Sequence, residues 1–485
     1  MIRVLPPYPA YKDSGVPWLG KVPEHWEVLP GRTVFREIND RCHPDEQSLS
    51  VTITRGVLRQ ADLLADSSKK DSSNEDKSNY KLVQPGDLVY NKMRAWQGAV
   101  GVSAYRGIVS PAYIVQRLRS AENLPRYIHF LLRTPFFASE AERWSYGITS
   151  DQWSLRAEEF KCIYFSLPPL PEQTAIVRFL DYMDRRIRRF IRAKQKLIKL
   201  LEEYRQALIH QAVTGKIDVR TGQPYTGYKD SGVPWLGQVP EHWEVRRLRN
   251  IVEMRVSNVD KHSKEGEQPV RLCNYVHVYK HERIRANMDF MKATASTEEI
   301  ERFRLERGDV LITKDSEAWD DIGVPALVEY SAPDLISGYH LALLRPSHVV
   351  EGTFLLRALQ NPQVAYQFHV EATGVTRYGL SHDAIKSALV PLPPLPEQTA
   401  IVEYLDAQTA KLDAAIAAAR REIELLREYR ERLIADVVTG KVDVRQVAAQ
   451  LPEEPAEEEA GTEEEEAVAE ELATVDSQEE SNGEE

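Results

Sequence analysis

The sequence predicts an α+β fold: two globular mixed α/β domains, separated by two long antiparallel coiled-coil helices, in a pseudo-twofold tandem duplication. Three observations support this prediction. Several short stretches occur twice, two segments of about 40 residues carry a heptad pattern of apolar residues, and short strand-like runs lie between the repeats. A chain of 485 residues is also too long for one ordinary domain.

Three pairs of matching stretches define the duplication. The first pair is offset by 217 residues and the other two by 225. The pairs are YKDSGVPWLGKVPEHWEV from Tyr11 and again from Tyr228 with one change, LPPLPEQTAIV at Leu167–Val177 and Leu392–Val402, and VTGKIDVR at Val213–Arg220 returning as VTGKVDVR at Val438–Arg445. A period of this length indicates a duplicated domain rather than a solenoid of short repeats.

These markers divide the chain into alternating repeated and unmatched segments. The unmatched segments hardly resemble each other in sequence. The expected organisation is a repeated segment at 1–28, a globular domain at 29–166, a repeated region with a long helix at 167–227, a repeated segment at 228–245, a globular domain at 246–391, a repeated region with a long helix at 392–445, and an acidic tail at 446–485.

A long helix is expected after each copy of LPPLPEQ. The prolines exclude helix before this point, and Gly215 and Gly440 can end the helices. Apolar residues step by three and four through both segments, which is typical of a coiled-coil seam. One such helix cannot bury its seam alone, so the two are expected to pack antiparallel. The expected seam residues are Ile176, Leu180, Met183, Ile187, Leu197, Leu201, Leu208, Ile401, Leu405, Leu412, Leu426 and Leu433.

The two unmatched segments read as mixed domains with a common pattern. GDLVYNKM and GIVSPAYIVQRL in the first, and GDVLITKDS and GVPALVEY in the second, are expected strands bounded by Gly and Pro. LPRYIHFLLRTPFFASEAERW and GTFLLRALQNPQVAYQFHV are expected to be helical. The segments therefore share an architecture without sharing a surface.

The net charge of −12 is concentrated in one part of the chain. The last 34 residues hold 16 acidic side chains and no basic one, and without them 62 basic residues face 58 acidic ones. The tail has too little apolar content to fold and is expected to be disordered. Near-neutral charge elsewhere leaves nucleic-acid binding open, because placement matters more than the sum.

Other features bear on location. No run of 18 apolar residues exists, and the N-terminus lacks an apolar signal region. Cys42, Cys162 and Cys273 form no CxxC pair or disulfide framework, and we expect all three to be buried. These features favour a cytoplasmic protein.

Signatures of catalysis are missing from the sequence. There is no Asn/Asp-Pro-Pro-aromatic motif, no glycine-rich nucleotide fingerprint and no GxxxxGK[ST] loop, and the histidines lack metal-ligand spacing. Asp309 and Lys314 could be forced into a nuclease pattern, but their strand is also a plausible recognition hairpin. We therefore expect no enzyme and no metal site in this chain.

The doubled LPPLPEQTAIV before a long helix, the doubled YKDSGVPWLG stretch, and the motifs GDLVYNKMRAWQG and GDVLITKDSEAW resemble the DNA-specificity subunits of type I restriction–modification systems. The resemblance covers residues 11–445. It implies that 29–166 and 246–391 are target-recognition domains, each reading one half of a bipartite, asymmetric DNA site. The helices would act as a ruler that fixes the gap between the half-sites.

The resemblance also implies partners. The repeated regions would dock two identical adenine-N6 methyltransferase subunits, and restriction translocase subunits would join them for cleavage. S-adenosylmethionine, ATP and Mg²⁺ would be bound by those partners, and this chain would carry no cofactor. The rival hypotheses are an interaction adaptor that has lost DNA binding and a stand-alone DNA-modifying enzyme.

Candidate DNA-binding residues follow from residue type. Arg and Lys pair with guanine, Gln pairs with adenine, and Glu accepts from cytosine. A loop stabilised by local pairs around a tucked tryptophan is the alternative for each residue. The first set follows the GD strands and comprises Lys92, Arg94, Trp96 and Gln97 in the first domain and Lys314, Ser316, Glu317 and Trp319 in the second.

A second set precedes each copy of LPPLPEQ. RWSYGITSDQWSLRAEEFK aligns without gaps with the equivalent stretch of the second half, so that Leu155 matches Leu380. Structural roles remain open for these residues, particularly for the tyrosines. The candidates are Arg143, Tyr146, Gln152, Arg377 and Tyr378.

A basic cluster, RRIRRFIRAKQK at Arg185–Lys196, lies within the first long helix. A solvated or partner-facing helix face is the simpler interpretation, and contact with phosphates or with an acidic methyltransferase surface is the functional one. The second helix has no equal cluster, which favours an asymmetric role.

Overall fold

The structure is a computed structural model that describes residues 5–65, 77–147 and 153–452. The chain forms two compact units. Unit 1 contains the residues up to Gln195 together with those from Arg421 onward, and unit 2 contains Lys196–Arg420. Each unit thus holds one globular domain and parts of both long helices.

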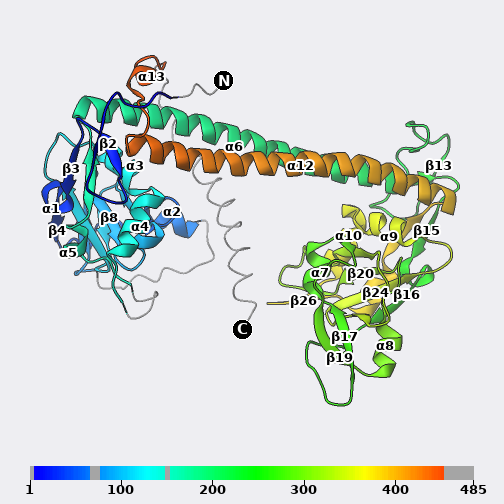
Figure 1. Cartoon of the computed structure of the whole chain (residues 1–485). Helices are drawn as coiled ribbons and strands as arrows, with labels where there is room; N and C mark the ends of the chain where they lie inside the picture. Colours follow the sequence, from blue (N-terminus) through cyan, green and yellow to red (C-terminus); the bar gives the residue numbers. More distant parts are fainter. Residues whose placement is uncertain (1–4, 66–76, 148–152, 453–485) are drawn as a thin grey trace. The chain divides into compact units, whose positions relative to one another are not determined.

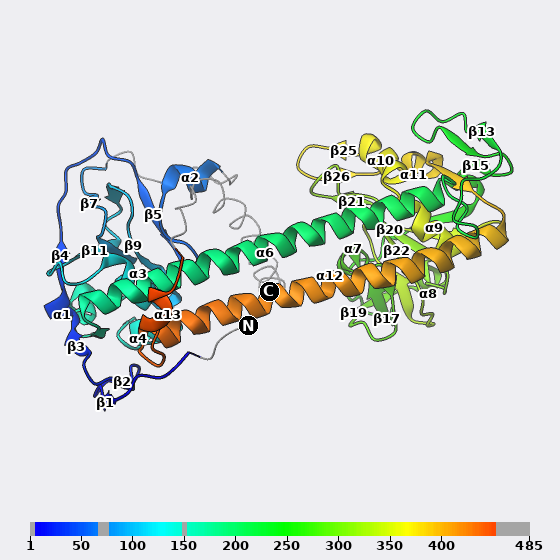
Figure 2. The ribbon, with the colours of Figure 1, turned by 90° about the horizontal axis from the view of Figure 1, so that it is seen from above.

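Two helices of 44 residues each, α6 (Leu170–Val213) and α12 (Leu395–Val438), lie side by side (Figures 1 and 2). In unit 1, Lys194 of α6 contacts Glu422 of α12 at 2.6 Å. Nearer the start of α6, Asp184 bonds Arg430, which lies further along α12. Rising numbers on one helix face falling numbers on the other, so the helices are antiparallel, as expected.

The globular domain of unit 1 is built on a four-stranded antiparallel sheet in the order β4-β11-β8-β9. Two-stranded sheets, β10-β7 and β5-β6, flank it. The domain strands are β4 (Phe35–Ile38), β5 (Leu49–Thr52), β6 (Gly56–Arg59), β7 (Lys81–Val83), β8 (Leu88–Asn91), β9 (Val100–Val102), β10 (Gly107–Val109) and β11 (Tyr113–Leu118). Its helices are α1 (Gly31–Val34), α2 (Gln60–Ala65), η1 (Ala95–Gln97), α3 (Pro125–Leu132), α4 (Pro135–Arg143) and α5 (Ala157–Phe160).

Unit 2 repeats this plan with additions. Its main sheet has the order β16-β24-β20-β22-β18, and two three-stranded sheets, β19-β17-β23 and β21-β26-β25, extend it. The domain strands are β16 (Val252–Val256), β17 (Gln268–Cys273), β18 (Arg283–Ile284), β19 (Met291–Ala295), β20 (Val310–Thr313), β21 (Asp315–Ser316), β22 (Pro325–Val328), β23 (Leu335–Ser337), β24 (Leu341–Pro346), β25 (Thr373–Gly374) and β26 (Tyr378–Gly379). Its helices are η3 (Leu248–Asn250), α7 (Tyr275–Lys280), α8 (Thr297–Phe303), α9 (Gly352–Leu359), α10 (Pro362–Glu371) and α11 (His382–Ser387).

The helical segment of each domain is two helices rather than one. Pro135 and Pro362 occupy the first turn of α4 and α10, where a missing N–H costs nothing. Thr134 and Asn361 cap these helices through side-chain oxygens. The proline therefore starts a new helix instead of extending the previous one.

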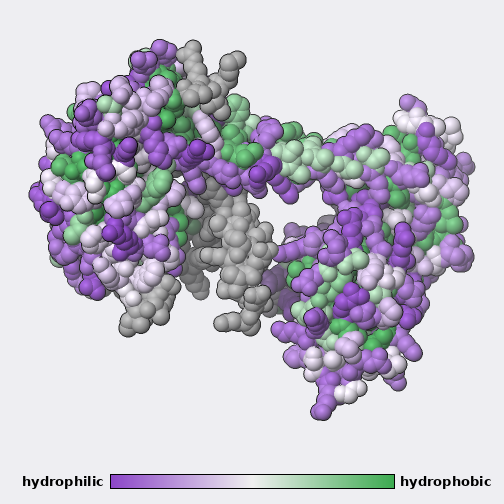
Figure 3. Space-filling view, viewed as in Figure 1, coloured by the Kyte–Doolittle hydropathy of each residue, from purple (hydrophilic) through white to green (hydrophobic). Residues whose placement is uncertain are grey.

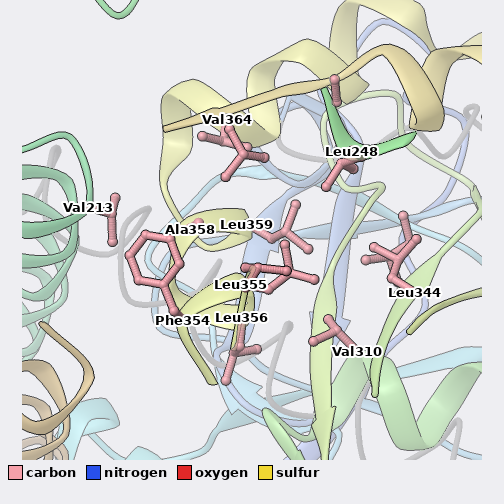
Figure 4. Close-up of a cluster of buried hydrophobic side chains, with 14 of the residues drawn as sticks. Val213, Leu248, Val310, Leu344, Phe354, Leu355, Leu356, Ala358, Leu359 and Val364 are labelled. Carbon is pink, nitrogen blue, oxygen red and sulfur yellow. The ribbon is translucent and has the colours of Figure 1, made fainter. Parts of the chain in front are cut away.

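A hydrophobic core joins each domain to the ends of the long helices. In unit 2, Phe354, Leu355 and Leu356 of α9 are fully buried. The ring of Phe354 lies toward Val213 of α6, and Leu355 lies on the side of the sheet residues Val310 and Leu344 (Figure 4). The core of unit 1 also combines helix and sheet residues and includes residues of α6 and α12. Hydrophilic residues cover much of the visible face of each domain (Figure 3).

The repeated segments form equivalent small sheets in the two units. The pairs β1-β2 and β3-β12 of unit 1 correspond to β13-β14 and β15-β27 of unit 2. Their strands are β1 (Tyr11–Asp13), β2 (Lys21–Pro23), β3 (Glu27–Pro30), β12 (Tyr164–Leu167), β13 (Tyr228–Asp230), β14 (Gln238–Pro240), β15 (Glu244–Arg247) and β27 (Leu389–Leu392).

In unit 1, the first described residues pack against the segment that follows α12. Asp443 donates its backbone N–H to the carbonyl of Pro6 at 2.7 Å, and Gly440 lies against Pro23. Gly215 lies against Pro240 in the same way in unit 2. Each copy of VTGK therefore packs on a copy of VPEHW, so the C-terminal repeat completes the N-terminal one.

Two expectations need correction. Helix α13 (Arg445–Ala449), with Ala448 buried, extends into the range 446–485 that was expected to be a disordered tail. Residues 453–485 of that tail lie outside the described residues. Burial of all three cysteines is wrong, because Cys42 is exposed and Cys162 is half-buried, whereas Cys273 is buried.

Candidate nucleic-acid interface

The first candidate loop of unit 1 follows β8 and contains η1. Arg94 and Gln97 are exposed, and Lys92 is half-buried. Trp96 donates its indole N–H to the carbonyl of Met93 at 3.0 Å and packs edge-on against Trp153 at 5.5 Å. These contacts give Trp96 a supporting position, which leaves Arg94 and Gln97 as the outward-facing groups of the loop.

The second candidate segment of unit 1 lies beside this loop. Leu155 donates its backbone N–H to the carbonyl of Lys92 at 2.8 Å. Tyr146 is exposed and pairs through its backbone with Ser154. Arg143, near Glu140 at 3.6 Å, is exposed at the end of α4. Gln152 lies outside the described residues.

The two candidate segments of unit 2 form one small sheet. Ser316 of β21 pairs with Tyr378 of β26, and Ser316 is buried. Glu317 is exposed, and Trp319 is 48 % exposed beside the ring of His369. The structure therefore leaves Glu317 and Trp319 open to a ligand and gives Ser316 a supporting position.

A polar network in unit 2 holds the remaining candidates. His340 bonds Asp315 through Nδ1 at 2.6 Å, and its Nε2 lies 3.3 Å from Arg377. Lys314 lies 3.4 Å from Asp315. His340 adopts φ +69°, an uncommon conformation for a residue other than glycine. Neither Asp315 nor His340 is among the candidates selected from the sequence. Asp315 directly follows Lys314 in the chain, which could have indicated it, whereas His340 is brought there only by the fold.

One backbone bond joins the candidate segments in both units. Leu380 donates to the carbonyl of Lys314 at 2.9 Å, as Leu155 does to Lys92. The gapless alignment had already matched Leu155 to Leu380. Each domain thus brings its two candidate segments together in the same way, but with different side chains.

An acidic anchor ties the repeated segments of each unit together. In unit 1, Glu172 accepts hydrogen bonds from Trp26 Nε1 at 2.9 Å and Tyr8 Oη at 2.6 Å, and His25 Nε2 lies 2.7 Å away. Burial and the neighbouring Glu172 carboxylate raise the pKa of Tyr8, which stays a donor. This anchor explains why EHW and PEQ are repeated together.

Unit 2 contains the same anchor. Glu397 accepts from Trp243 Nε1 at 2.8 Å and from Tyr225 Oη at 3.3 Å, and His242 lies 2.8 Å away. The repeated sequence is therefore a repeated framework, on which the differing candidate loops are mounted.

The acidic residue of each GD motif has a structural role. Arg345 donates from Nε and Nη2 to buried Asp309 at 2.9 and 2.8 Å. Arg117 donates to Asp87 in the same bidentate manner in unit 1. Both carboxylates are engaged within the fold, which favours a strand-end clamp over a nuclease role.

A cavity of about 650 Å³ in unit 1 lies between the globular domain and the long helices, beside Gln97. We call it the arginine cavity. Asp184 and Glu431 are the acidic residues of its lining, so positive charge is in excess by six. Its arginines are Arg55, Arg126, Arg133, Arg185, Arg188, Arg192, Arg427 and Arg430.

Burial and the arginines of the cavity shift the pKa values of two groups, His129 and Asp184. Burial, with Arg126 and Arg133 nearby, lowers the pKa of His129 to about 3. Burial raises the pKa of Asp184, but Arg430 and Arg188 outweigh this and hold it below its ordinary value. At neutral pH the cavity therefore contains a neutral histidine and an ionised aspartate. The sequence indicated only its Arg185–Lys196 part.

The seam residues differ in burial. Leu197 is 41 % exposed, unlike the rest of the expected seam. Met183, Leu201, Leu412 and Leu426 are half-buried. Those that are buried are Ile176, Leu180, Ile187, Leu208, Ile401, Leu405 and Leu433.

Membrane-spanning helices and clusters of metal ligands are both absent from the residues that the structure describes. No helix within 5–65, 77–147 and 153–452 combines the length and apolar character needed to cross a membrane. Over the same residues, no group of three or more His, Cys, Asp or Glu side chains is arranged to hold a metal ion.

Comparison with known proteins agrees with this architecture. A family model described as the type I restriction modification DNA specificity domain matches residues 52–200 and 240–425. The putative type I restriction enzyme MjaX specificity subunit of Methanocaldococcus jannaschii is 24 % identical, covering 88 % of this chain and 96 % of its own. The type I restriction enzyme EcoKI specificity subunit of Escherichia coli is 21 % identical, covering 87 % and 90 %.

A solved structure from work on complex assembly and conformational transition of the type I R-M system has the same fold, with a TM-score of 0.65 at 16 % identity, covering 87 % of this chain and 99 % of its own. These findings confirm the resemblance and the expected fold class. The chain belongs to the family of type I restriction–modification DNA-specificity subunits.

Proposed function

We propose that this specificity subunit reads a bipartite, asymmetric DNA target through its two different recognition domains. One observation carries the proposal. The anchors at Glu172 and Glu397 are alike in the two units, whereas the loops beginning at Lys92 and Lys314 differ. Equal frameworks suit equal partners, and unequal loops suit unequal half-sites.

We further propose that two adenine-N6 methyltransferase subunits dock on the repeated frameworks and that restriction translocase subunits join them. The chain itself is non-catalytic. S-adenosylmethionine, ATP and Mg²⁺ belong to those partners, and the complex acts in the cytoplasm, where its DNA target lies. Base-edge contacts from residues such as Arg94 and Glu317 set specificity, and phosphate contacts set register.

Binding and chemistry can be tested separately. The chain assembled with its methyltransferase should bind duplex DNA with an affinity that falls steeply with salt, by a log–log slope of about −0.9 per phosphate contact. Affinity that does not respond to salt would favour an adaptor. Purified chain alone, incubated with DNA and S-adenosylmethionine, should transfer no methyl groups, and transfer would contradict the non-catalytic assignment.

A further inference from the structure

The residues that line the arginine cavity all belong to unit 1. Helices α6 and α12 begin 225 residues apart, so Arg185, Arg188 and Arg192 correspond to Ala410, Asp413 and Ala417. The second helix thus replaces two of these three arginines by alanine and one by aspartate. The framework is duplicated, but only its first copy carries this positive charge on the long helix. This difference points to a ligand that binds unit 1 and not unit 2.

The described chain ends on helix α6, at a residue that lies seven positions before the first arginine of α6 in the cavity lining. Arg178 of α6 donates from Nη2 to the carbonyl of Leu451 at 2.6 Å. Arg178, Arg185 and Arg192 are spaced by seven residues, so they share a face of the helix at intervals of about 10 Å. The chain therefore leaves the fold on a row of arginines, two of which line the cavity.

The segment that follows has the complementary charge. Residues 453–485 hold 16 acidic side chains and no basic one. Guanidinium groups bind carboxylates in a bidentate manner. At about 3.3 Å per residue, the segment's 33 residues can extend roughly 110 Å, far more than the separation of Arg178 and Arg192. Attachment to the same unit also raises its effective concentration into the ~mM range.

We propose that residues 453–485 bind in the arginine cavity and compete there with DNA phosphates. A duplex, whose major groove alone is ~12 Å wide, can approach only the mouth of the cavity, whereas single glutamate side chains can enter. Gln97 of the candidate DNA-binding loop lines the cavity, so an occupied cavity weakens phosphate contacts there. This regulation goes beyond target recognition and leaves the target sequence unchanged.

Peptide binding tests the occupant without DNA. A labelled peptide of residues 453–485 is titrated, by fluorescence anisotropy at low salt, into the methyltransferase complex of a chain ending at Pro452 and into that of the full chain. We expect at least tenfold weaker binding to the full chain, whose own segment occupies the cavity. Equal binding to both chains, or no binding, would overturn the proposal.

Charge-matched variants locate the site. Arg185→Gln with Arg192→Gln should weaken peptide binding at least tenfold. Arg186→Gln with Arg421→Gln removes the same charge from α6 and α12 of unit 1, outside the cavity lining, and should weaken it less than threefold. Equal losses would mean unspecific attraction and overturn the assignment. Thermal unfolding and assembly with the methyltransferase confirm that both variants are folded.

DNA binding tests the competition. Truncation at Pro452 should raise affinity for non-target duplex about tenfold at low salt, and Arg185→Gln with Arg192→Gln should remove most of this gain. Equal affinity of the full and truncated chains would refute competition. If the cavity variant weakens DNA binding but not peptide binding, the cavity is a DNA site and the proposal fails. If no form binds DNA, recognition itself fails, and the peptide measurement still decides the occupant.

Discussion

Glu172 accepts a hydrogen bond from the indole of Trp26 at 2.9 Å, although 146 residues separate them in the sequence. The same bond joins Glu397 to Trp243 at 2.8 Å. These pairs connect the N-terminal part of each repeated framework to the start of its long helix.

Replacing the anchor carboxylate should destabilise one unit. Glu172→Ala leaves the buried Trp26 N–H and the Tyr8 hydroxyl without their acceptor, so the free energy of unfolding should fall by about 3 kcal/mol. Hydrogen exchange should show the loss in unit 1, and Glu397→Ala should move it to unit 2. Glu172→Gln keeps one acceptor and should cost less. Equal loosening of both units by Glu172→Ala would contradict the anchor.

The close contacts of Gly440 with Pro23 and of Gly215 with Pro240 should tolerate no added side chain. Both glycines have positive φ, and an added Cβ would lie 2.3 Å from the Cδ of Pro23 and Pro240, respectively. We expect each Gly→Ala change to lower the free energy of unfolding by about 3 kcal/mol, from backbone strain and overpacking together.

Gly222→Ala separates the two costs. Its φ is also positive, but its Cβ would meet no atom within 4 Å, so only the backbone cost of about 1 kcal/mol should remain. Urea unfolding measures all three variants. A loss for Gly215→Ala no larger than that for Gly222→Ala would exclude the packing role.

Unit 1 should lose stability as the pH falls below about 6.5. His129 has a folded pKa of about 3 and an unfolded pKa of about 6.5, so the unfolded state takes up the proton first. The contribution of neutral His129 to the free energy of unfolding is complete above pH 6.5. Below pH 6.5 this contribution should decline by about 1.4 kcal/mol per pH unit, down to the folded pKa.

Urea unfolding between pH 7 and 5 checks this dependence. The fifth residue of α3 is His129, and the fifth residue of α9 is Leu356, so unit 2 should lack this contribution. His129→Gln should make the free energy of unfolding of unit 1 less dependent on pH. An unchanged slope in that variant would assign the effect to another group.

Each candidate base contact should affect its own half-site. Arg94→Ala should weaken binding of the complex 10- to 100-fold and relax the half-site read by unit 1, because a good Arg–base pair contributes about 1–3 kcal/mol. Arg377→Ala should do the same for the other half-site. Lys12→Ala, which removes a charge from β1, should leave both unchanged. Competition binding with singly mutated duplexes measures this, and uniform weakening over all sequences would reassign Arg94 to phosphate contact.

Much of the fold could be predicted because the duplication repeats its own landmarks. The heptad pattern predicted α6 and α12, and the two GD motifs predicted β8 and β20. Both signals lie in the local sequence. The break before Pro135 was missed, although a proline after a threonine cap is a readable start signal. Leu197 fits the heptad pattern of the seam but is exposed in the structure. Heptad spacing identifies residues on one helix face, but it does not identify the neighbour that packs against each of them.

The candidate site could be predicted only where its side chains are neighbours in the sequence. Lys92 and Arg94 stand next to a strand, so residue type and position sufficed to select them. The arginine cavity combines Arg126 of α3 with Arg188 and Arg430 of the long helices, which only the tertiary fold brings together. The packing of the first described residues against the segment that follows α12 was equally invisible to a reading in chain order.

Base-resolution mapping of N6-methyladenine tests the central claim most directly. The genome of a strain expressing the methyltransferase subunit is compared with and without this chain, and with residues 29–166 exchanged for another recognition domain. We predict that removal of the chain abolishes one bipartite, asymmetric methylated motif and that the exchange alters one half of it. An unchanged methylome while the assembled complex is present, or an exchange that alters both halves, would contradict the account.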